Sequence, residues 1–483
     1  MEKIPTNSRF LLLLQFLDKT SLGYTALLGI RADTHLVGDE YSWINSIFYF
    51  GYFLWSFPTS CLIVRVPLGK YLAFVVVAWG AVLACHAACH NYAGFMVARF
   101  LLGIMESSVA PGFSFLTGKF YKREEQPLRY VYFQIRSLCI QVTIKLDMEF
   151  GIWYVFEMAQ WHLKITHTLE QGNSFAGLIG GVLAYGIGHI NAKLYSWQYL
   201  FIILCSATSA CGIALFWLLP DGPDTAWFLS PMERVTAVER TKDAYQTTGS
   251  KEFQMYQVWE ALKDPQSWLL SLNMLGCMLV NSGLSAFTGI IIAGFGYAGL
   301  QALLYQMPAS AVQIGLVLIT SLCGSYIPNC RCIMLAILSL ISIIGVLLVY
   351  LLDDSHTQAK LFGASIMGAF ACILPISMST VSSNISGSAK KTTVSAMLFL
   401  SYCIGNIINP QVFLTREEPK YPTGIKVCLT GLSLGFVSAV GLRFYLQHCN
   451  TLAKVSYEPE GSEVVDQYQD RTDREIPGFI YLL

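Results

Sequence analysis

The sequence predicts an all-α membrane protein with twelve transmembrane helices arranged in two six-helix halves. Apolar stretches of roughly twenty residues, a length that crosses a bilayer as a helix, recur along most of the chain. Hydrophobic residues make up 54% of the 483 residues and charged residues only 13%, and the charges gather between the apolar stretches. Helices suit such stretches because a helix satisfies its own backbone polar groups where no water is available.

Six apolar stretches form the predicted N-terminal half, residues 1–219. They are Phe10–Ile30, Ile44–Val64, Tyr71–Ala88, Tyr92–Gly118, Gly172–Ile190 and Tyr199–Leu219. Each can cross a hydrocarbon core of about 30 Å as a helix that rises about 1.5 Å per residue. Residues 131–171, between the fourth and fifth stretches, break this rhythm. They form an anomalous insertion that is polar and poorly periodic, and its charges argue against a further span.

The remaining six stretches form the predicted C-terminal half, residues 267–446. They are Trp268–Phe287, Leu300–Gly324, Cys332–Leu352, Leu361–Val381, Val394–Val412 and Ile425–Tyr445. A polar segment of mixed charge, residues 220–266, joins the halves, and we interpret it as a solvated cytoplasmic linker. Residues 447–483 are predicted to form a cytoplasmic tail.

The distribution of Lys and Arg predicts the orientation in the membrane. With a cytoplasmic N-terminus, the inside loops hold Arg65, Lys70, Lys119, Lys122, Arg123, Arg129, Arg234, Arg240, Lys242, Lys251, Lys263, Arg331, Lys390 and Lys391. The outside loops hold only Arg31, Lys193, Lys360, Arg416 and Lys420. We therefore expect both termini in the cytoplasm, and we expect the glycosylation sequon at Asn384, which falls in an inside loop, to stay unmodified.

Several function classes are disfavoured by the sequence. The formal net charge is zero, which gives no electrostatic case for nucleic acid as a partner. No nucleotide-binding loop or nucleophile–base arrangement indicates an enzyme, and no cofactor is expected. Cys85, His86, Cys89 and His90 include positions four apart that share a helix face, but their spacing matches no common zinc pattern, so no metal site is predicted.

Charged residues inside the apolar stretches are the strongest site candidates. Asp18 and Lys19 interrupt the first stretch, and Glu106 lies in the fourth. Such charges cost several kcal/mol unless they are paired or face a water-filled cavity. Function and a structural ion pair between helices both remain open on this evidence. Arg99 is either another contact for an anion or a residue that snorkels to the membrane surface.

Four amides in otherwise apolar stretches are further candidates: Asn173, Asn281, Gln313 and Asn406. An amide within a span can form hydrogen bonds between helices or can line a substrate cavity. Both interpretations stay open for each of the four.

Several segments together resemble the major facilitator superfamily, and within it the fungal allantoate permease group of anion:cation symporters. The segments are Asp18–Tyr24, Ser46–Tyr52, Pro67–Tyr71, Arg99–Gly103 with Glu106 and Pro111-Gly112, Lys390–Thr393, Tyr402–Ile408 and Pro410-Gln411. The resemblance covers nearly the whole chain. One departure is Ser56 and Ser60 around Pro58, where the group often has Glu and Asn, which leaves the substrate range open.

The resemblance implies a secondary active transporter that moves a small organic anion together with protons by alternating access. It implies that Asp18 and Glu106 carry protons, that Lys19 meets a substrate carboxylate, and that Arg65 and Lys70 belong to a cytoplasmic gating turn. We expect a monomer in the lipid bilayer of the plasma membrane. Allantoate, nicotinate, pantothenate-like acids and short peptides are all candidate substrates.

Two other hypotheses remain. One is a nutrient sensor that keeps the fold and signals without net transport. The other is an inactive product of a mis-spliced gene model, because removing Val131–Phe150 and Val155–Gln171 restores the pattern of the group. Both blocks begin with Val, whose codons start with GT, and the second ends with Gln, whose codon can be CAG. These are splice-site signals, so we interpret the two blocks as short introns translated in frame through retention or a gene-model error. The alternative is a genuine cytoplasmic insertion.

Overall fold

The computed structural model describes residues 7–109, 111–113, 116, 168–190, 192–222, 225–227, 230–232, 234–236, 254–297, 299–327, 329–456, 470–476 and 478–483. All of its regular elements in these residues are helices. The anomalous insertion lies outside the described residues except for its last four, because α9 begins at Thr168.

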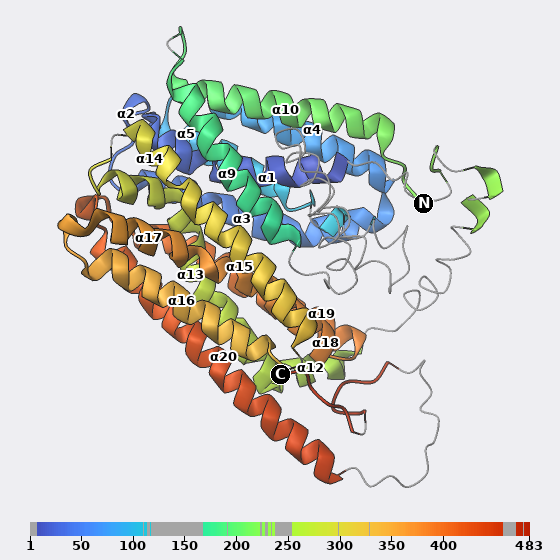
Figure 1. Cartoon of the computed structure of the whole chain (residues 1–483). Coiled ribbons are helices and arrows are strands. Elements are labelled where there is room, and N and C mark those ends of the chain that lie inside the picture. The colour runs from blue at the N-terminus through green and yellow to red at the C-terminus, as the bar shows by residue number, and fades with distance from the viewer. Residues whose placement is uncertain are drawn as a thin grey trace, which may run out of the picture.

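The N-terminal half contains six long helices and a short α2 (Ile30–Asp33). The long helices are α1 (Asn7–Leu27), α3 (Glu40–Arg65), α4 (Leu68–Ala87), α5 (Tyr92–Glu106), α9 (Thr168–Gly188) and α10 (Ser196–Leu218). Within this half α4 packs along α10 and α3 packs along α5. Figure 1 shows these helices, coloured blue to green, gathered in the upper part of the molecule.

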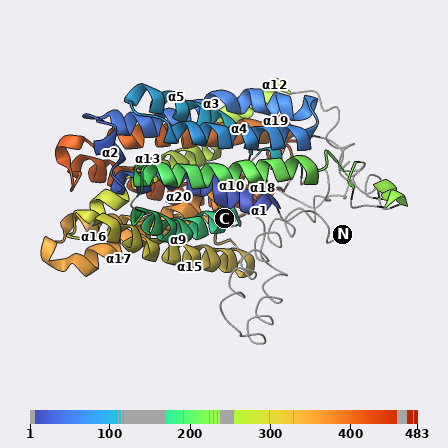
Figure 2. The same cartoon turned by 90° about the horizontal axis from the view of Figure 1, so that it is seen from above.

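The C-terminal half supplies the other six spans. They are α13 (Pro265–Ala293), α15 (Met307–Tyr326), α16 (Arg331–Leu351), a tenth span made of α17 (Thr357–Met367), η2 (Gly368–Cys372) and α18 (Ile373–Asn384), then α19 (Ser388–Gln411) and α20 (Pro422–Ser456). Helix α13 packs against both α19 and α20. Seen from above, the long helices of both halves lie alongside one another in a common direction (Figure 2).

The predicted twelve-helix fold is confirmed. Among the described residues, ten helical stretches are long and apolar enough to cross a membrane, and α1 and α9 complete the twelve. Large apolar side chains on the outer faces, such as Phe57 and Trp217, are more than 70% exposed, as expected of surfaces that contact lipid.

Several boundaries differ from the predicted ones. Helix α20 runs to Ser456, eleven residues past the expected end at Tyr445, and α13 begins at Pro265. The start of α13 is fixed locally, since the Asp264 side chain accepts a hydrogen bond from the backbone N–H of Gln266 and proline suits a first helical position. The linker also contains a helix, α12 (Met255–Lys263). Apolar length alone does not reveal such polar extensions.

Close helix contacts in the N-terminal half depend on glycine. A Cβ atom on Gly103 of α5 would overlap the carbonyl oxygen of Phe48 in α3, and one on Gly51 would overlap the carbonyl oxygen of Phe100. Small residues let helix backbones approach in lipid, where van der Waals packing replaces the hydrophobic effect. This contact fixes α5, and with it Arg99 and Glu106, against α3.

The two ends of the bundle carry different polar elements. The α12 side carries α12 and the turn between α18 and α19 (Ile385–Gly387), and the α2 side carries α2 and η3 (Thr415–Glu417).

Candidate functional site

A cavity of about 290 Å³ lies between the two halves. Helices α1 and α9 line it from the N-terminal half, and α13, α15, the tenth span and α19 line it from the C-terminal half. Its polar lining residues are Gln15, Lys19, Thr20, Tyr24, Asn281, Ser285, Thr288, Gln306, Ser310, Gln313 and Tyr402. The lining therefore combines one cation with several amides and hydroxyls, groups that can hold a small polar anion.

Lys19 occupies the wall of this cavity inside an aromatic cage. Its Nζ donates a hydrogen bond to the Tyr402 hydroxyl at 2.8 Å. The same atom lies 5.1 Å from the ring centre of Tyr49, 5.5 Å from that of Tyr402 and 5.8 Å from that of Phe48. Aromatic faces stabilise an ammonium without neutralising it. Within the described residues no carboxylate lies within salt-bridge distance of Nζ, so the charge remains available to an anion.

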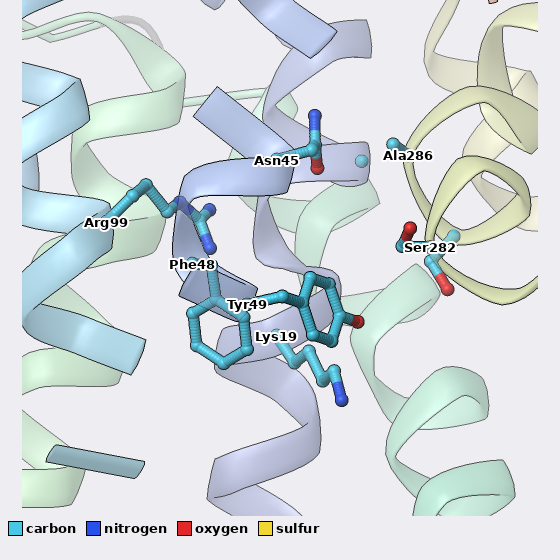
Figure 3. A pocket seen from close by; sticks show the side chains of 9 residues that line it. Lys19, Asn45, Phe48, Tyr49, Arg99, Ser282 and Ala286 are labelled. Atoms are coloured by element: carbon cyan, nitrogen blue, oxygen red, sulfur yellow. The ribbon is translucent and has the colours of Figure 1, made fainter. Parts of the chain in front are cut away.

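A second, much smaller pocket of about 20 Å³ adjoins Lys19. Figure 3 shows the rings of Phe48 and Tyr49 between Arg99 of α5 and Lys19 of α1, with Ser282 across the gap on α13. Arg99 is only 3% exposed, so it does not snorkel, and the interpretation that placed it at the membrane surface is wrong.

The two candidate proton carriers, Asp18 and Glu106, do not line either of these two pockets. Asp18 and Glu106 are almost completely buried, at 0% and 1% exposure. Glu106 accepts a 3.4 Å hydrogen bond from Gln15, whereas in the described part of the chain neither oxygen of Asp18 has a hydrogen-bond partner. Arg99 and Glu106 both act electrostatically on Asp18. Neither carboxyl forms a salt bridge with a described residue, which disfavours a structural ion pair as their only role.

The four amides have different positions. Asn281 and Gln313 line the cavity. Asn406 is fully buried between α13 and α19, where its Oδ1 accepts a 2.9 Å hydrogen bond from Nδ2 of Asn281. Asn406 therefore holds the helices together and orients Asn281. The side chain of Asn173 lies outside the described residues, although its backbone belongs to α9.

Sequence reasoning missed several lining residues, chiefly Gln15, Gln306 and Tyr402. Gln15 could have been found, because it precedes Lys19 by four positions and so shares its helix face. Tyr402 gave no such signal, since its contact with Lys19 spans 383 residues of sequence.

Of the four Cys and His residues near the end of α4, His86 belongs to the packing of the N-terminal half, whereas Cys85 and His90 are exposed. His86 is buried, its Nδ1 is 2.9 Å from the carbonyl oxygen of Val82, and its ring packs against Phe201 at 5.3 Å. Cys89 donates to the carbonyl oxygen of Cys85. The described residues contain no group of three or more His, Cys, Asp or Glu side chains placed to hold a metal.

Polar contacts join the two halves on the α2 side. Arg31 of α2 makes a bidentate pair with Glu418 at 3.0 and 2.8 Å, and this hydrogen bonding raises the pKa of the Arg31 guanidinium. Ser46 of α3 donates to the carbonyl oxygen of Ile407 and accepts from Gln411, both at 2.8 Å. These contacts join the two halves at this end of the bundle.

Comparison with known proteins shows the family. The Major Facilitator Superfamily profile matches residues 10–138 and 172–410, which leaves residues 139–171 unmatched. Among curated proteins, an uncharacterized transporter of Schizosaccharomyces pombe is 31% identical over 97% of this chain and 83% of its own. The allantoate permease of Saccharomyces cerevisiae is 31% identical over 97% and 82%, and a thiamine pathway transporter of the same yeast is 30% identical over 97% and 83%.

Solved structures show the same fold. A D-xylose–proton symporter superposes with a TM-score of 0.61 at 10% identity, covering 90% of this chain and 95% of its own. A bacterial homologue of the human lysosomal transporter Spinster superposes with a TM-score of 0.57 at 16% identity, covering 94% and 98%. The relatives and the family are transporters rather than enzymes. The chain is therefore an integral membrane transporter of the major facilitator superfamily, and it belongs with the fungal transporters related to allantoate permease.

Proposed function

We propose that this transporter is a symporter that moves a small organic anion with protons by alternating access. The observation that carries the proposal is Lys19, a cation without a carboxylate partner among the described residues, placed in the wall of a polar cavity between the halves. A substrate carboxylate bound there would gain a charge-assisted hydrogen bond in a site of low dielectric. The amides Asn281, Gln306 and Gln313 are placed to bind the rest of the molecule.

Proton coupling is assigned to Asp18 and Glu106. Asp18 adjoins Lys19 in sequence, and Glu106 acts electrostatically on the Lys19 ammonium. An anion that binds Lys19 would change the electrostatic field at both carboxyls, so their protonation and substrate binding would be linked. Protons taken up on one side of the membrane would be released on the other after the halves rock about the cavity.

The same proposal includes the cellular orientation. We infer that the α12 side faces the cytoplasm and the α2 side faces outward, in the plasma membrane, because Lys and Arg are concentrated in the loops of the α12 side. Reporter fusions at Gly249 and Lys390 should then read cytoplasmic, and a fusion at Asp354 should read external. A cytoplasmic signal at Asp354 would contradict the orientation.

Uptake into proteoliposomes tests the function. Labelled allantoate is the first anion to try, because the relative named for it is 31% identical, followed by nicotinate, pantothenate and a dipeptide. We expect concentrative uptake when the lumen is alkaline and none without a pH gradient. Lys19→Gln should abolish binding of the anion, whereas Lys19→Arg, which keeps the charge, should retain part of it.

Counterflow separates coupling from binding. Asp18→Asn and Glu106→Gln should each abolish uptake driven by the pH gradient while sparing exchange of labelled for unlabelled anion. Asp39→Asn is the matched control, because Asp39 is an exposed carboxylate at the start of α3 whose side chain makes no cap hydrogen bond. Unchanged concentrative uptake in both carboxyl variants would refute the coupling assignment.

We also propose that Val131–Phe150 and Val155–Gln171 are absent from the functional transporter. The family profile resumes at residue 172, directly after the second block, and its first match ends at residue 138, within the first block. Most transcript reads should join the codon of Tyr130 to that of Gly151, and that of Tyr154 to that of Gly172. Uniform read coverage across both blocks, with equal activity of the 483-residue form, would show that the insertion is genuine.

A further inference from the structure

The segment of residues 470–476 and 478–483, here called the strap, lies against the α12 side of the C-terminal half. It follows α20 in the chain and returns to the ends of α12, α16, α18 and α19, as the red trace and the C label in Figure 1 show. Its buried residues include Thr472, Asp473 and Tyr481. A terminal segment with buried polar residues needs specific partners, and the strap has them.

The first part of the strap caps α19. The N-cap of that helix, Gly387, has no side chain to offer. Instead the carboxylate of Asp470 accepts from the backbone N–H of Ser388 at 2.9 Å and from its hydroxyl. The amide oxygen of Gln257 in α12 accepts from the N–H groups of Ala389 and Lys390 at 3.0 and 3.3 Å. An anion at a helix N-terminus also interacts favourably with the helix dipole.

The middle of the strap neutralises a buried ammonium. The side chain of Lys390 is completely buried, and its Nζ lies 2.7 Å from Asp473 of the strap, 2.9 Å from Glu260 of α12 and 3.0 Å from Asp264. The hydroxyl of Tyr481 donates to the second oxygen of Asp473 at 2.8 Å. The side chains of Lys390 and Asp473 are both completely buried, so loss of Lys390 would leave the Asp473 carboxylate without a compensating charge.

The last part of the strap is recognised through its backbone. The side chain of Asn384 donates to the carbonyl oxygen of Leu482 at 2.7 Å and accepts from its N–H at 2.8 Å. Asn450 of α20 makes the same pair of hydrogen bonds with Tyr481, at 2.9 and 2.8 Å. Two asparagines that each satisfy both polar groups of one residue form a binding site for extended chain.

We propose that α12, the α18–α19 turn and the adjoining end of α20 form a docking site for the strap of the same chain, and that the docked strap remains part of the C-terminal half throughout the transport cycle. Its named partners belong to the linker helix or to that half. The strap thereby fixes α12 to the C-terminal half. The end of the linker that carries α12 is therefore held in place against that half. The same contact buries the Asn384 amide of the glycosylation sequon against Leu482.

A protease recognition sequence placed between Ser456 and Asp470 of the full chain tests the docking. After cleavage and size-exclusion chromatography, mass spectrometry should find the strap peptide still bound to the transporter. In Asp473→Asn the cleaved peptide should be lost, and the melting temperature should fall by roughly 3–5 °C. Glu475→Gln, the same change at an exposed strap carboxylate, keeps a side-chain oxygen that can accept from Tyr256 and Thr472, so it should retain the peptide. Loss of the peptide from the unmutated protein would overturn the proposal.

A cross-link tests whether docking persists during transport. Tyr256 of α12 and Glu475 of the strap meet at the surface, where the tyrosine hydroxyl donates to Glu475 Oε2 at 3.3 Å. Tyr256→Cys with Glu475→Cys, joined by a flexible bismaleimide, should leave uptake at the level of the two single variants treated in the same way. Loss of uptake only in the cross-linked double variant would show that the strap must release, and would overturn the proposal of permanent docking.

Discussion

Two groups of buried charges, one in each half, are arranged in opposite ways. In the N-terminal half both oxygens of Asp18, one oxygen of Glu106 and two nitrogens of Arg99 have no hydrogen-bond partner among the described residues. In the C-terminal half the ammonium of Lys390 is surrounded by three carboxylates. Both groups bear the cost of removing charge from water, but only the second offsets that cost with ideal partners. The saturated cluster, Lys390 with its three carboxylates, stabilises one structure. The unsatisfied cluster, Asp18, Glu106 and Arg99, still has polar atoms that can bind a proton or a ligand.

The largest expected effect follows from breaking the saturated cluster. Lys390→Met leaves Asp473 buried without its cation, and we expect the free energy of unfolding to fall by about 3–5 kcal/mol. Thermal unfolding in detergent measures this. Lys391→Met is the control, because the Lys391 ammonium donates at the surface to the carbonyl oxygen of Ser382, and it should cost less than about 1 kcal/mol. Equal costs for the two lysines would contradict the comparison.

A larger side chain at the contact between α1 and α13 should abolish transport while lowering stability only moderately. A Cβ on Gly23 of α1 would overlap the carbonyl oxygen of Ser285 in α13. Gly23→Leu should therefore prevent closure on the α2 side and abolish uptake, at a cost in stability of about 1–3 kcal/mol. Gly186→Leu controls for the added side chain, since nothing lies within 4 Å of a Cβ there. Normal uptake by Gly23→Leu would show that α1 and α13 need not approach so closely.

The unsatisfied cluster should tolerate loss of charge. Asp18→Asn removes a buried carboxylate that has no hydrogen-bond partner among the described residues, so the melting temperature should stay within a few degrees or rise, a change of about 1 kcal/mol or less. The same variant should lose pH-driven uptake. A large drop in stability would show that the Asp18 carboxylate stabilises the fold, as Lys390 does.

The smallest effect is expected on the α2 side. Arg31 and Glu418 are partly exposed, at 24% and 35%, and an exposed pair contributes less than about 1 kcal/mol. Arg31→Glu should shift the halves modestly toward opening at this end and change uptake no more than a few-fold. The exchanged pair, Arg31→Glu with Glu418→Arg, should restore the original rate. No recovery in the double variant would mean that the pair does not join the halves.

The fold was predictable because lipid imposes one strong rule, that each span must be apolar and helical. That rule identified the spans and left Asp18, Lys19 and Glu106 as exceptions. It could not reveal partners in the fold: the Tyr402 hydroxyl that binds Lys19, or the Asn406 amide that orients Asn281. Polar elements outside the lipid, such as the strap, were not predicted from the sequence for a related reason. The strap is short and mixed in composition, and nothing in its own residues indicates that Lys390 is its partner.

The capping of α19 has a consequence for biogenesis. Lys390 and Asp473 are separated by 83 positions, so α19 is synthesised well before the carboxylates of the strap that neutralise and cap its first turn. Until residues 470–483 leave the ribosome, that turn has only Gln257, Glu260 and Asp264 as partners, and the groups that the strap will bind must stay in contact with water or with a chaperone. Truncations that remove residues 470–483 but spare every membrane span should therefore be recognised by quality control as unfinished protein, and a short deletion within these residues should act through degradation rather than through the transport site.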